Sequence, residues 1–388
     1  RSPGGLKPAG YEDSNDAAGV TSRPYSPWST LAPTSWTPML EQSGRASRAG
    51  VSVAGSDVLG YHAYAAALAW LVSQPAGTPS VGAASPDFGA SYSYTRWTLQ
   101  PWVAVSRSTS FFGVLPAAGD VPATATLRER QIETGLLLPR VHVHQSQAVR
   151  LSYIRTIADI LLPDGTATVN RSAMRGSWTI GTAKMFGYSI SPERGVLAGV
   201  TAEAVRRALG ADDDATNVTG DVRAYVPGLA RHHVVALRIA GGASRGDGNA
   251  QRVFLLGGGF AAPGPGNFSS EAFSLLRGFA VDSFAGTHVA IANADYRLPL
   301  WRPERGIGPL PVFLHTVHAS VIADAGQIWT EQFSRRDLKY AAGAELSADV
   351  VLGYALPLTF ATGAAWGHDG SGLVADGWRT YVRVGKAF

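Results

Sequence analysis

The stretch WRTYVRVGKAF, residues 378–388, decides the fold that this sequence predicts. Read with the two-residue period of a strand, it has one largely apolar face and one largely basic face. The first face holds Trp378, Thr380, Val382, Val384 and Phe388, and the second holds Arg379, Tyr381, Arg383 and Gly385. Such a strand suits the wall of a barrel with lipid outside and water inside. This stretch alone leaves open a soluble protein that ends on a buried strand.

The composition favours a membrane barrel. Hydrophobic residues make up 45% of the 388 residues, yet the mean hydropathy is only +0.03. No run approaches the roughly 18 apolar residues that a membrane-spanning helix needs. Only helices and closed barrels satisfy every backbone polar group in lipid, so a membrane protein of this kind is expected to be a closed sheet. The 45 glycines and 23 prolines suit many strands and tight turns.

Several other classes of function find little support. The chain has no cysteine, which excludes disulfides and thiolate metal sites, and its net charge of +4 without a basic run does not favour nucleic-acid binding. His142 and His144, with His315 and His318, are candidate metal ligands, but no carboxylate stands at ligand spacing. The triplet at 257–259 is not followed by the lysine of a phosphate loop, and no nucleophile elbow occurs. We therefore expect no cofactor, no metal and no catalysed reaction.

The chain divides into two predicted parts. Residues 1–34 begin with a stretch rich in Gly, Pro, Ser and Asp, which indicates a linker or periplasmic arm, and residues 35–388 are predicted to form the barrel. Sixteen strands can be laid out in it, each near the 9–11 residues that a tilted membrane strand requires. They are 35–41, 46–56, 61–72, 88–96, 101–112, 125–138, 147–160, 174–184, 196–207, 220–226, 232–242, 287–298, 312–324, 338–348, 354–365 and 378–388.

Alternation and loop lengths support this layout. In 220–226, Asp221 and Arg223 lie opposite Val222 and Val226, and a watery lumen permits charge on one face, whereas the core of a sandwich would not. Short connections alternate with longer polar ones such as 73–87, 113–124 and 161–172, as expected for periplasmic turns and outer loops. Many tryptophans fall near strand ends, which is typical of membrane interfaces.

The connection 243–286 is the longest, and it contains the tetrad Leu276-Arg277-Gly278-Phe279. With the preceding LGGG at 256–259 and the strand that ends at 293–300, it resembles the BamA/TamA superfamily of outer-membrane barrels, surface-antigen type. In that family the sixth outer loop carries an (L/V)RG(F/Y) motif and folds into the lumen, and a later strand carries Phe-x-Asp-x-Gly. Asp324 and Gly326 match that second motif, Ile322 replaces its aromatic residue, and Asp295 stands where the family usually has Glu.

The resemblance implies an all-β, 16-stranded antiparallel transmembrane barrel in the bacterial outer membrane, with 243–286 folded inward between strands 11 and 12. It also implies that Phe388 is a carboxy-terminal assembly signal. Arg277 would bring a guanidinium into a confined lumen, so we expect it to pair with Asp324, sharing the contact with Asp295. Expected partners are outer-membrane lipid and lipopolysaccharide, and periplasmic or outer-membrane proteins, but not nucleic acid.

The function that this resemblance favours is a protein translocation or insertion pore, or the barrel component of an envelope assembly. A passive diffusion porin and a barrel-embedded lipid enzyme are the alternatives. Residues 1–45 contain no recognisable POTRA domain, and 25–33 resemble the lead-in of members whose barrel follows another periplasmic module. Pro38 lacks a backbone donor, so the pairing of 35–41 with 378–388 is predicted to be short.

Overall fold

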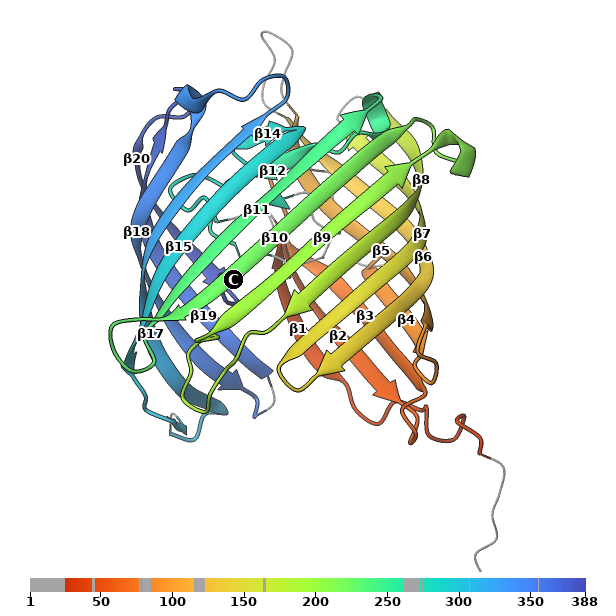
Figure 1. Ribbon diagram of the computed structural model, residues 1–388, viewed down its shortest axis with the longest axis horizontal. Helices are drawn as coiled ribbons and strands as arrows, with labels where there is room; N and C mark the ends of the chain where they lie inside the picture. Colours follow the sequence, from red (N-terminus) through yellow and green to blue (C-terminus); the bar gives the residue numbers. More distant parts are fainter. Residues whose placement is uncertain are drawn as a thin grey trace, which may run out of the picture.

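A wall of sixteen antiparallel strands dominates the structure (Figure 1). The structure is a computed structural model, and it describes residues 25–43, 46–76, 78, 85–114, 123–162, 165–260, 262, 272–273, 275–306, 308–354 and 356–388. The strands of the wall are β1 (Thr37–Ser43), β2 (Ala46–Ser56), β3 (His62–Ser73), β4 (Asp87–Tyr94), β5 (Gln100–Val114), β6 (Ala123–His142), β7 (Gln145–Leu162), β8 (Gly165–Gly181), β9 (Gly195–Val205), β10 (Ala215–Pro227), β11 (Val234–Gly246), β15 (His288–Trp301), β17 (Val312–Trp329), β18 (Lys339–Leu352), β19 (Leu356–Asp369) and β20 (Gly377–Val384). Each pairs with the next along the chain, which confirms the predicted all-β barrel.

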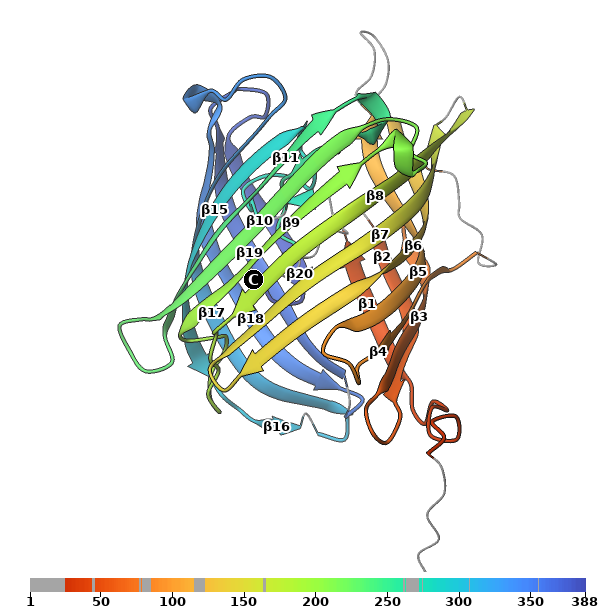
Figure 2. The same ribbon diagram turned by 45° about the vertical axis from the view of Figure 1, so that its right-hand side comes forward.

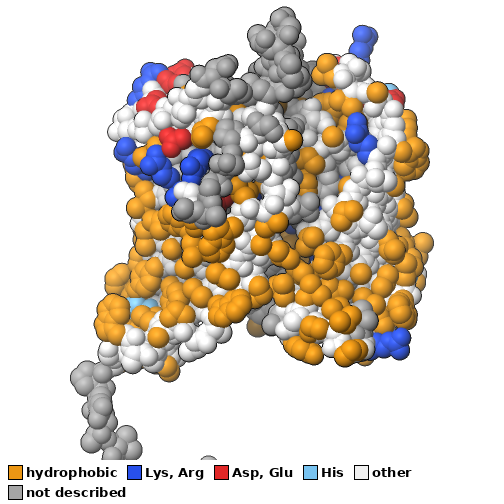
Figure 3. Space-filling view, turned by 180° about the vertical axis from the view of Figure 1, so that it is seen from behind, with side chains coloured by type: hydrophobic (Ala, Val, Ile, Leu, Met, Phe, Trp, Pro, Cys, Tyr) orange, Lys and Arg blue, Asp and Glu red, His pale blue; other side chains and the backbone are white. Residues whose placement is uncertain are grey.

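The two faces of the wall follow the alternation of the sequence. On β10, Val222 and Val226 are about half exposed, while Asp221 and Arg223, on either side of Val222, are buried. Ile239 on β11 is likewise exposed. Apolar side chains therefore cover the outside as a broad band (Figure 3), and the charged side chains gather inside.

The prediction of a long loop at 161–172 was wrong. β7 continues to Leu162 and β8 begins at Gly165, with Leu162 paired to Gly165 in the ladder. The first four residues of β8 are exposed, so this end of the hairpin is surrounded by solvent. In water a strand pair needs no apolar face, and for that reason the polar sequence there resembled a loop.

The long connection, predicted at residues 243–286, begins after β11 ends at Gly246, and its described part folds into the barrel (Figure 2). Its described part includes β12 (Phe254–Leu256), β13 (Ala272–Phe273) and β14 (Phe284–Gly286), which form a small sheet with β12 in the middle. Their apolar side chains join a buried cluster with residues of the wall. The cluster consists of Ala240, Phe254, Leu256, Phe273, Leu276, Phe279, Phe284, Val289 and Ile291. We refer to the described residues between β11 and β15 as the long loop.

The first and last strands meet at a seam. In the described residues no backbone ladder joins β1 to β20: β1 pairs only with β2, and β20 only with β19. Figure 3 shows the wall from behind, hollowed between two apolar halves. A short pairing was predicted here, and the structure has none among the residues it describes.

The last residues leave the wall. Trp378 and Val382 face outward on β20, exposed by 70% and 66%, and Arg383 faces the lumen. β20 ends at Val384, and Gly385 has a φ of +105°, a conformation that glycine adopts without strain. Residues 385–388, which we call the tail, therefore turn inward, and Phe388 is buried. The prediction that Phe388 continues the outer face of a strand was wrong.

The remaining elements are small. β16 (Arg305–Gly306) adds to β17, and three 3₁₀ turns are η1 (Arg207–Leu209), η2 (Gly248–Ala250) and η3 (Arg335–Asp337). Among the described residues, no helix has the length and apolar character to cross a membrane. Most of the predicted arm, residues 1–24, lies outside the described residues, and the Tyr25 hydroxyl after it donates a hydrogen bond to the Asp57 carboxylate.

Candidate functional site

The backbone just before the tetrad is held in an unusual conformation. Leu275 is fully buried with a φ of +75°, in the left-handed region that a leucine rarely adopts. Its N–H donates to the carbonyl of Gly258 at 3.0 Å, and its carbonyl accepts from the Asn293 amide at 2.5 Å. Such a conformation persists only where the surroundings enforce it, and these contacts fix the direction in which the next residues point.

Arg277 points from this turn to two carboxylates of the wall. Its Nε and Nη2 donate to the two oxygens of Asp324 at 2.9 and 2.6 Å, the bidentate geometry that favours Arg over Lys. Nη2 also donates to Asp295 Oδ1 at 2.6 Å. The guanidinium, which comes from the long loop, thus bridges β15 and β17. We call Arg277, Asp295 and Asp324 the lock.

The lock is buried and its charges are nearly balanced. The side chains of Arg277 and Asp324 have no exposed surface, and that of Asp295 is 1% exposed. Asp324 also accepts the backbone N–H of Arg277 at 3.0 Å and the Asn293 amide at 2.8 Å. Asp295 also accepts from Arg297 at 3.0 Å. Two arginines therefore face two carboxylates, and removal of one member would leave a buried charge without its partner.

Gly278 and Phe279 explain why the tetrad can lie so close to the wall. A Cβ on Gly278 would lie 2.6 Å from the Cα of Gly367 on β19, so no larger residue fits without displacing a strand. The Phe279 ring packs edge-on against that of Phe284, with centroids 5.3 Å apart. Gly278 permits the approach, and Phe279 fills the apolar space beside it.

Gly326 lies on the wall beside β12. It is buried on β17, and a Cβ there would lie 3.5 Å from the Leu256 side chain, an ordinary contact, and 3.3 Å from the Ala290 carbonyl of β15. The approach of the inner sheet is therefore less tight here than at Gly278. The structure thus brings Asp324 and Gly326 under two different parts of the long loop.

Sequence reasoning missed two members of the surrounding network, Asn293 and Arg297. Both lie on β15 with Asp295 between them at the two-residue period, so alternation could have placed all three on the lumen face. Asn293 accepts from Arg238 Nη1 at 3.2 Å, and Arg238 donates to Asp221 at 2.8 Å. The lock is therefore continuous with a polar network that crosses β10, β11 and β15.

The long loop has a second charged attachment. Arg252 lies near its start, and its Nη2 is 3.5 Å from Glu203 Oε2 on β9, while its backbone N–H donates to Ser244 Oγ at 2.8 Å. Glu203 is also paired with Arg171 and Arg175, each at 2.5 Å. Sequence reasoning did not identify this pair, because no local motif marks it.

The end of the barrel with short turns carries its own charged contact. Glu193, in the connection between β8 and β9, accepts from Ser189 at 2.7 Å and lies 2.8 Å from His232 Nδ1 in the β10–β11 turn. Burial acts to raise the pKa of Glu193, but the hydrogen bonds from His232 and Ser189 outweigh it and hold the pKa below its ordinary value. The contact ties two connections together.

The four candidate histidines lie on separate parts of the wall. His142 ends β6 and His144 lies in the turn after it, both exposed, whereas His315 and His318 belong to β17. Within the part of the chain that the structure describes, no three His, Asp or Glu side chains are arranged to hold a metal ion. The lock and the close packing of Gly278 and Phe279 can hold the long loop against the lumen wall.

Comparison with known proteins agrees with this architecture. Residues 82–363 match a family model described as the Omp85 superfamily domain. The fold is similar to BamA from Haemophilus ducreyi lacking POTRA domains 1-3, with a TM-score of 0.58 and 14% identity over 90% of this chain and 69% of that chain. It is also similar to CdiB from Escherichia coli, with a TM-score of 0.59 and 12% identity over 94% of this chain and 63% of that chain. For CdiB from Acinetobacter baumannii the TM-score is 0.56 and the identity 10%, over 88% of this chain and 57% of that chain. The chain thus spans less than two thirds of either CdiB chain. No curated protein matches the sequence.

Proposed function

Because this chain belongs to the Omp85 superfamily and its barrel lies in the bacterial outer membrane, we propose that it inserts proteins into that membrane or translocates them across it. The client is a polypeptide, and the barrel provides the passage and the membrane contact. No catalysed reaction is part of this proposal. Outer-membrane lipid and lipopolysaccharide surround the apolar band.

The observation that carries the proposal is the seam. β1 and β20 each have one paired edge, and among the described residues neither pairs with the other. An unpaired strand edge presents a row of N–H and C=O groups that another extended chain can join. In lipid these groups need partners, so a client strand at the seam would satisfy them.

The lock argues against the diffusion porin. The long loop occupies the lumen, and Arg277 attaches it to β15 and β17 through buried contacts of 2.6 to 2.9 Å. A loop that only narrows a water-filled channel can be held by solvent-exposed ion pairs, whose charges stay hydrated. A fully buried ion pair must first lose its hydration, and this cost is not needed for narrowing alone. The expected resting state therefore has a small conductance with rare openings.

Two sequence predictions belong to the same proposal. Residues 1–34 are a linker or arm toward a periplasmic part, and the protein partners are periplasmic or outer-membrane proteins. Phe388 acts as an assembly signal of this barrel itself. Since its side chain is buried in the folded state, that role is exerted before the barrel closes.

Reconstitution into liposomes tests the proposal. The purified barrel is mixed with a urea-unfolded outer-membrane protein, and folding is followed by protease resistance; acceleration over empty liposomes supports an insertion activity. The chain has no cysteine, so one cysteine in β1 and one in β20 allow the seam to be closed by a disulfide and reopened with reductant. Large, steady ion currents with no effect on client folding would support the porin and refute the proposal.

A further inference from the structure

The tail occupies the lumen and does not extend the wall. After Gly385, whose N–H donates to the Thr359 carbonyl at 2.7 Å, Ala387 and Phe388 are 6% and 7% exposed. Phe388 packs in an apolar site formed by β10, β11 and the long loop. This site contains Tyr225, Val234, Ala236 and Leu275. The end of the last strand is therefore held from inside the barrel.

The long loop contacts the tail and the end of β20 directly. The Ala262 N–H donates to the Ala387 carbonyl at 2.8 Å, and Arg383 Nη1 donates to the Gly259 carbonyl at 3.0 Å. A Cβ on Gly259 would lie 2.6 Å from the Tyr381 ring. The loop and β20 thus pack against each other at several points.

Arg297 connects this contact to the lock. Its Nη2 donates to Asp295 Oδ2 at 3.0 Å, while Asp295 Oδ1 accepts from Arg277. Its Nη1 donates to the main-chain oxygen of Phe388 at 3.1 Å, and its guanidinium lies 4.6 Å from the centroid of the Phe388 ring. One buried arginine of β15 therefore holds a carboxylate of the lock on one side and the tail on the other.

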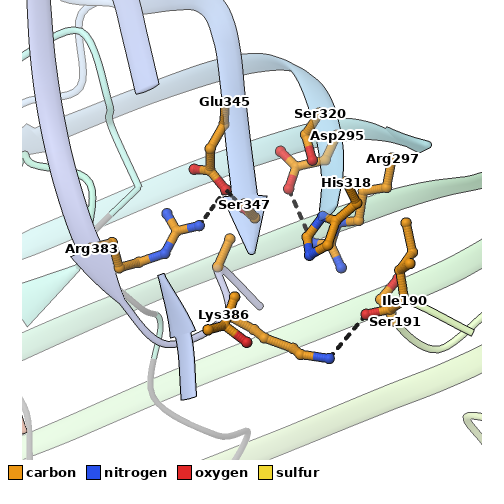
Figure 4. A pocket seen from close by; sticks show the side chains of 12 residues that line it. Ile190, Ser191, Asp295, Arg297, His318, Ser320, Glu345, Ser347, Arg383 and Lys386 are labelled. Atoms are coloured by element: carbon orange, nitrogen blue, oxygen red, sulfur yellow. Dashed lines mark hydrogen bonds and ion pairs between the residues drawn. The ribbon is translucent and has the colours of Figure 1, made fainter. Parts of the chain in front are cut away.

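The space beside Arg297 is small. A cavity of about 20 Å³ lies among Arg297, His318, Glu345, Arg383 and Lys386 (Figure 4), with Lys386 donating to the Ile190 carbonyl at 2.9 Å. This is room for roughly one water molecule, too little for a substrate.

We infer that Arg297 is a positioning residue that couples the lock to β20, so that release of the long loop and movement of β20 at the seam are one event. The inference rests on the proposed function, in which the seam opens. β20 has no ladder partner on the seam side among the described residues, so besides β19 the lumen contacts restrain it. Coupling of this kind is reciprocal: loosening the tail loosens the lock, and loosening the lock loosens β20.

A double-mutant cycle tests the coupling without any client protein. Amide hydrogen exchange is measured by mass spectrometry in lipid nanodiscs for Arg277→Gln, Arg297→Gln and the double variant, over residues 275–279 and 377–384. Each single variant is expected to speed exchange in both segments by about tenfold or more, because a hydrogen bond to a charged group is lost. The double variant is expected to exceed the faster single variant by little, since both break one connection.

Arg130→Gln is the control. Arg130 is also paired with a carboxylate, Asp159 at 2.9 Å, but the pair lies between β6 and β7, neither of which is a seam strand. It should leave both segments unchanged. If Arg277→Gln speeds only the loop, Arg297→Gln speeds only β20, and the effects multiply in the double variant, the coupling is refuted.

A covalent tether gives a test that does not depend on these substitutions. Ala262→Cys with Ala387→Cys joins loop and tail, in a chain that otherwise has no cysteine. Oxidation should slow exchange at both the lock and β20, and a reductant should restore it. Slowing at the tail alone would overturn the coupling. Failure of client insertion with coupled exchange intact would count against the proposed function only.

Discussion

Replacement of Arg277 by alanine should release the long loop. The change removes three side-chain hydrogen bonds, two to Asp324 and one to Asp295, and leaves two carboxylates in a site with almost no exposure. Breaking a buried ion pair by removing one partner costs about 3–5 kcal/mol. Asp295 keeps Arg297, and Asp324 keeps Asn293 and a backbone N–H, so we place the cost near the lower end, about 3 kcal/mol.

That cost predicts a large change in the population of the released loop. A free-energy change of about 3 kcal/mol shifts an equilibrium by roughly 150-fold. In planar bilayers the Arg277→Ala barrel should therefore open far more often than the wild type, and protease added from outside should cut the long loop faster. Arg130→Ala, at the Asp159 pair between β6 and β7, should change neither reading. Equal opening rates for wild type and Arg277→Ala would refute the lock.

Two other substitutions probe separate contacts. Gly278→Ala should release the long loop as strongly as Arg277→Ala, because its Cβ would lie 2.6 Å from the Cα of Gly367. Gly89→Ala is the control, since a Cβ there meets nothing within 4 Å, and it should leave the conductance unchanged. Glu193 has a lowered folded pKa, so its contact with His232 should stabilise the β8–β9 connection above the ordinary pKa of 4.5 and lose that effect as the pH falls below it. Glu193→Gln should flatten this dependence in hydrogen exchange measured from about pH 6 to about pH 3, and an unchanged profile would show that another group titrates.

The wall was predictable because lipid and water select side chains at a two-residue period. On β10, the charged Asp221 marks the lumen face and the apolar Val222 marks the lipid face. The same reasoning placed most of the sixteen strands. It failed at 165–172, where the β7–β8 hairpin continues into solvent and neither face needs to be apolar. Strand pairing outside the membrane depends on the backbone ladder, which leaves no pattern in the sequence.

The site was only partly accessible from the sequence. The tetrad and the spacing to Asp324 indicated the pairing of Arg277, because an arginine in a confined lumen requires a carboxylate. The inward turn of the tail at Gly385 could not be seen, since the stretch 378–388 alternates without interruption up to that glycine. The role of Arg297 was hidden for the same reason: its partner Phe388 was expected on the outer face.

Hydrogen exchange of the unaltered barrel in lipid nanodiscs tests most directly whether the wall is open at the seam while the lumen is closed by the lock. An open seam and a locked loop predict fast exchange in alternate residues of β1 and of β20, slow exchange in β17, and slow exchange at Arg277, whose N–H donates to the buried Asp324. Protection of β1 and β20 equal to that of β17 would show a closed ladder at the seam. Fast exchange at Arg277 would show that the loop is not locked, and either result would contradict the account.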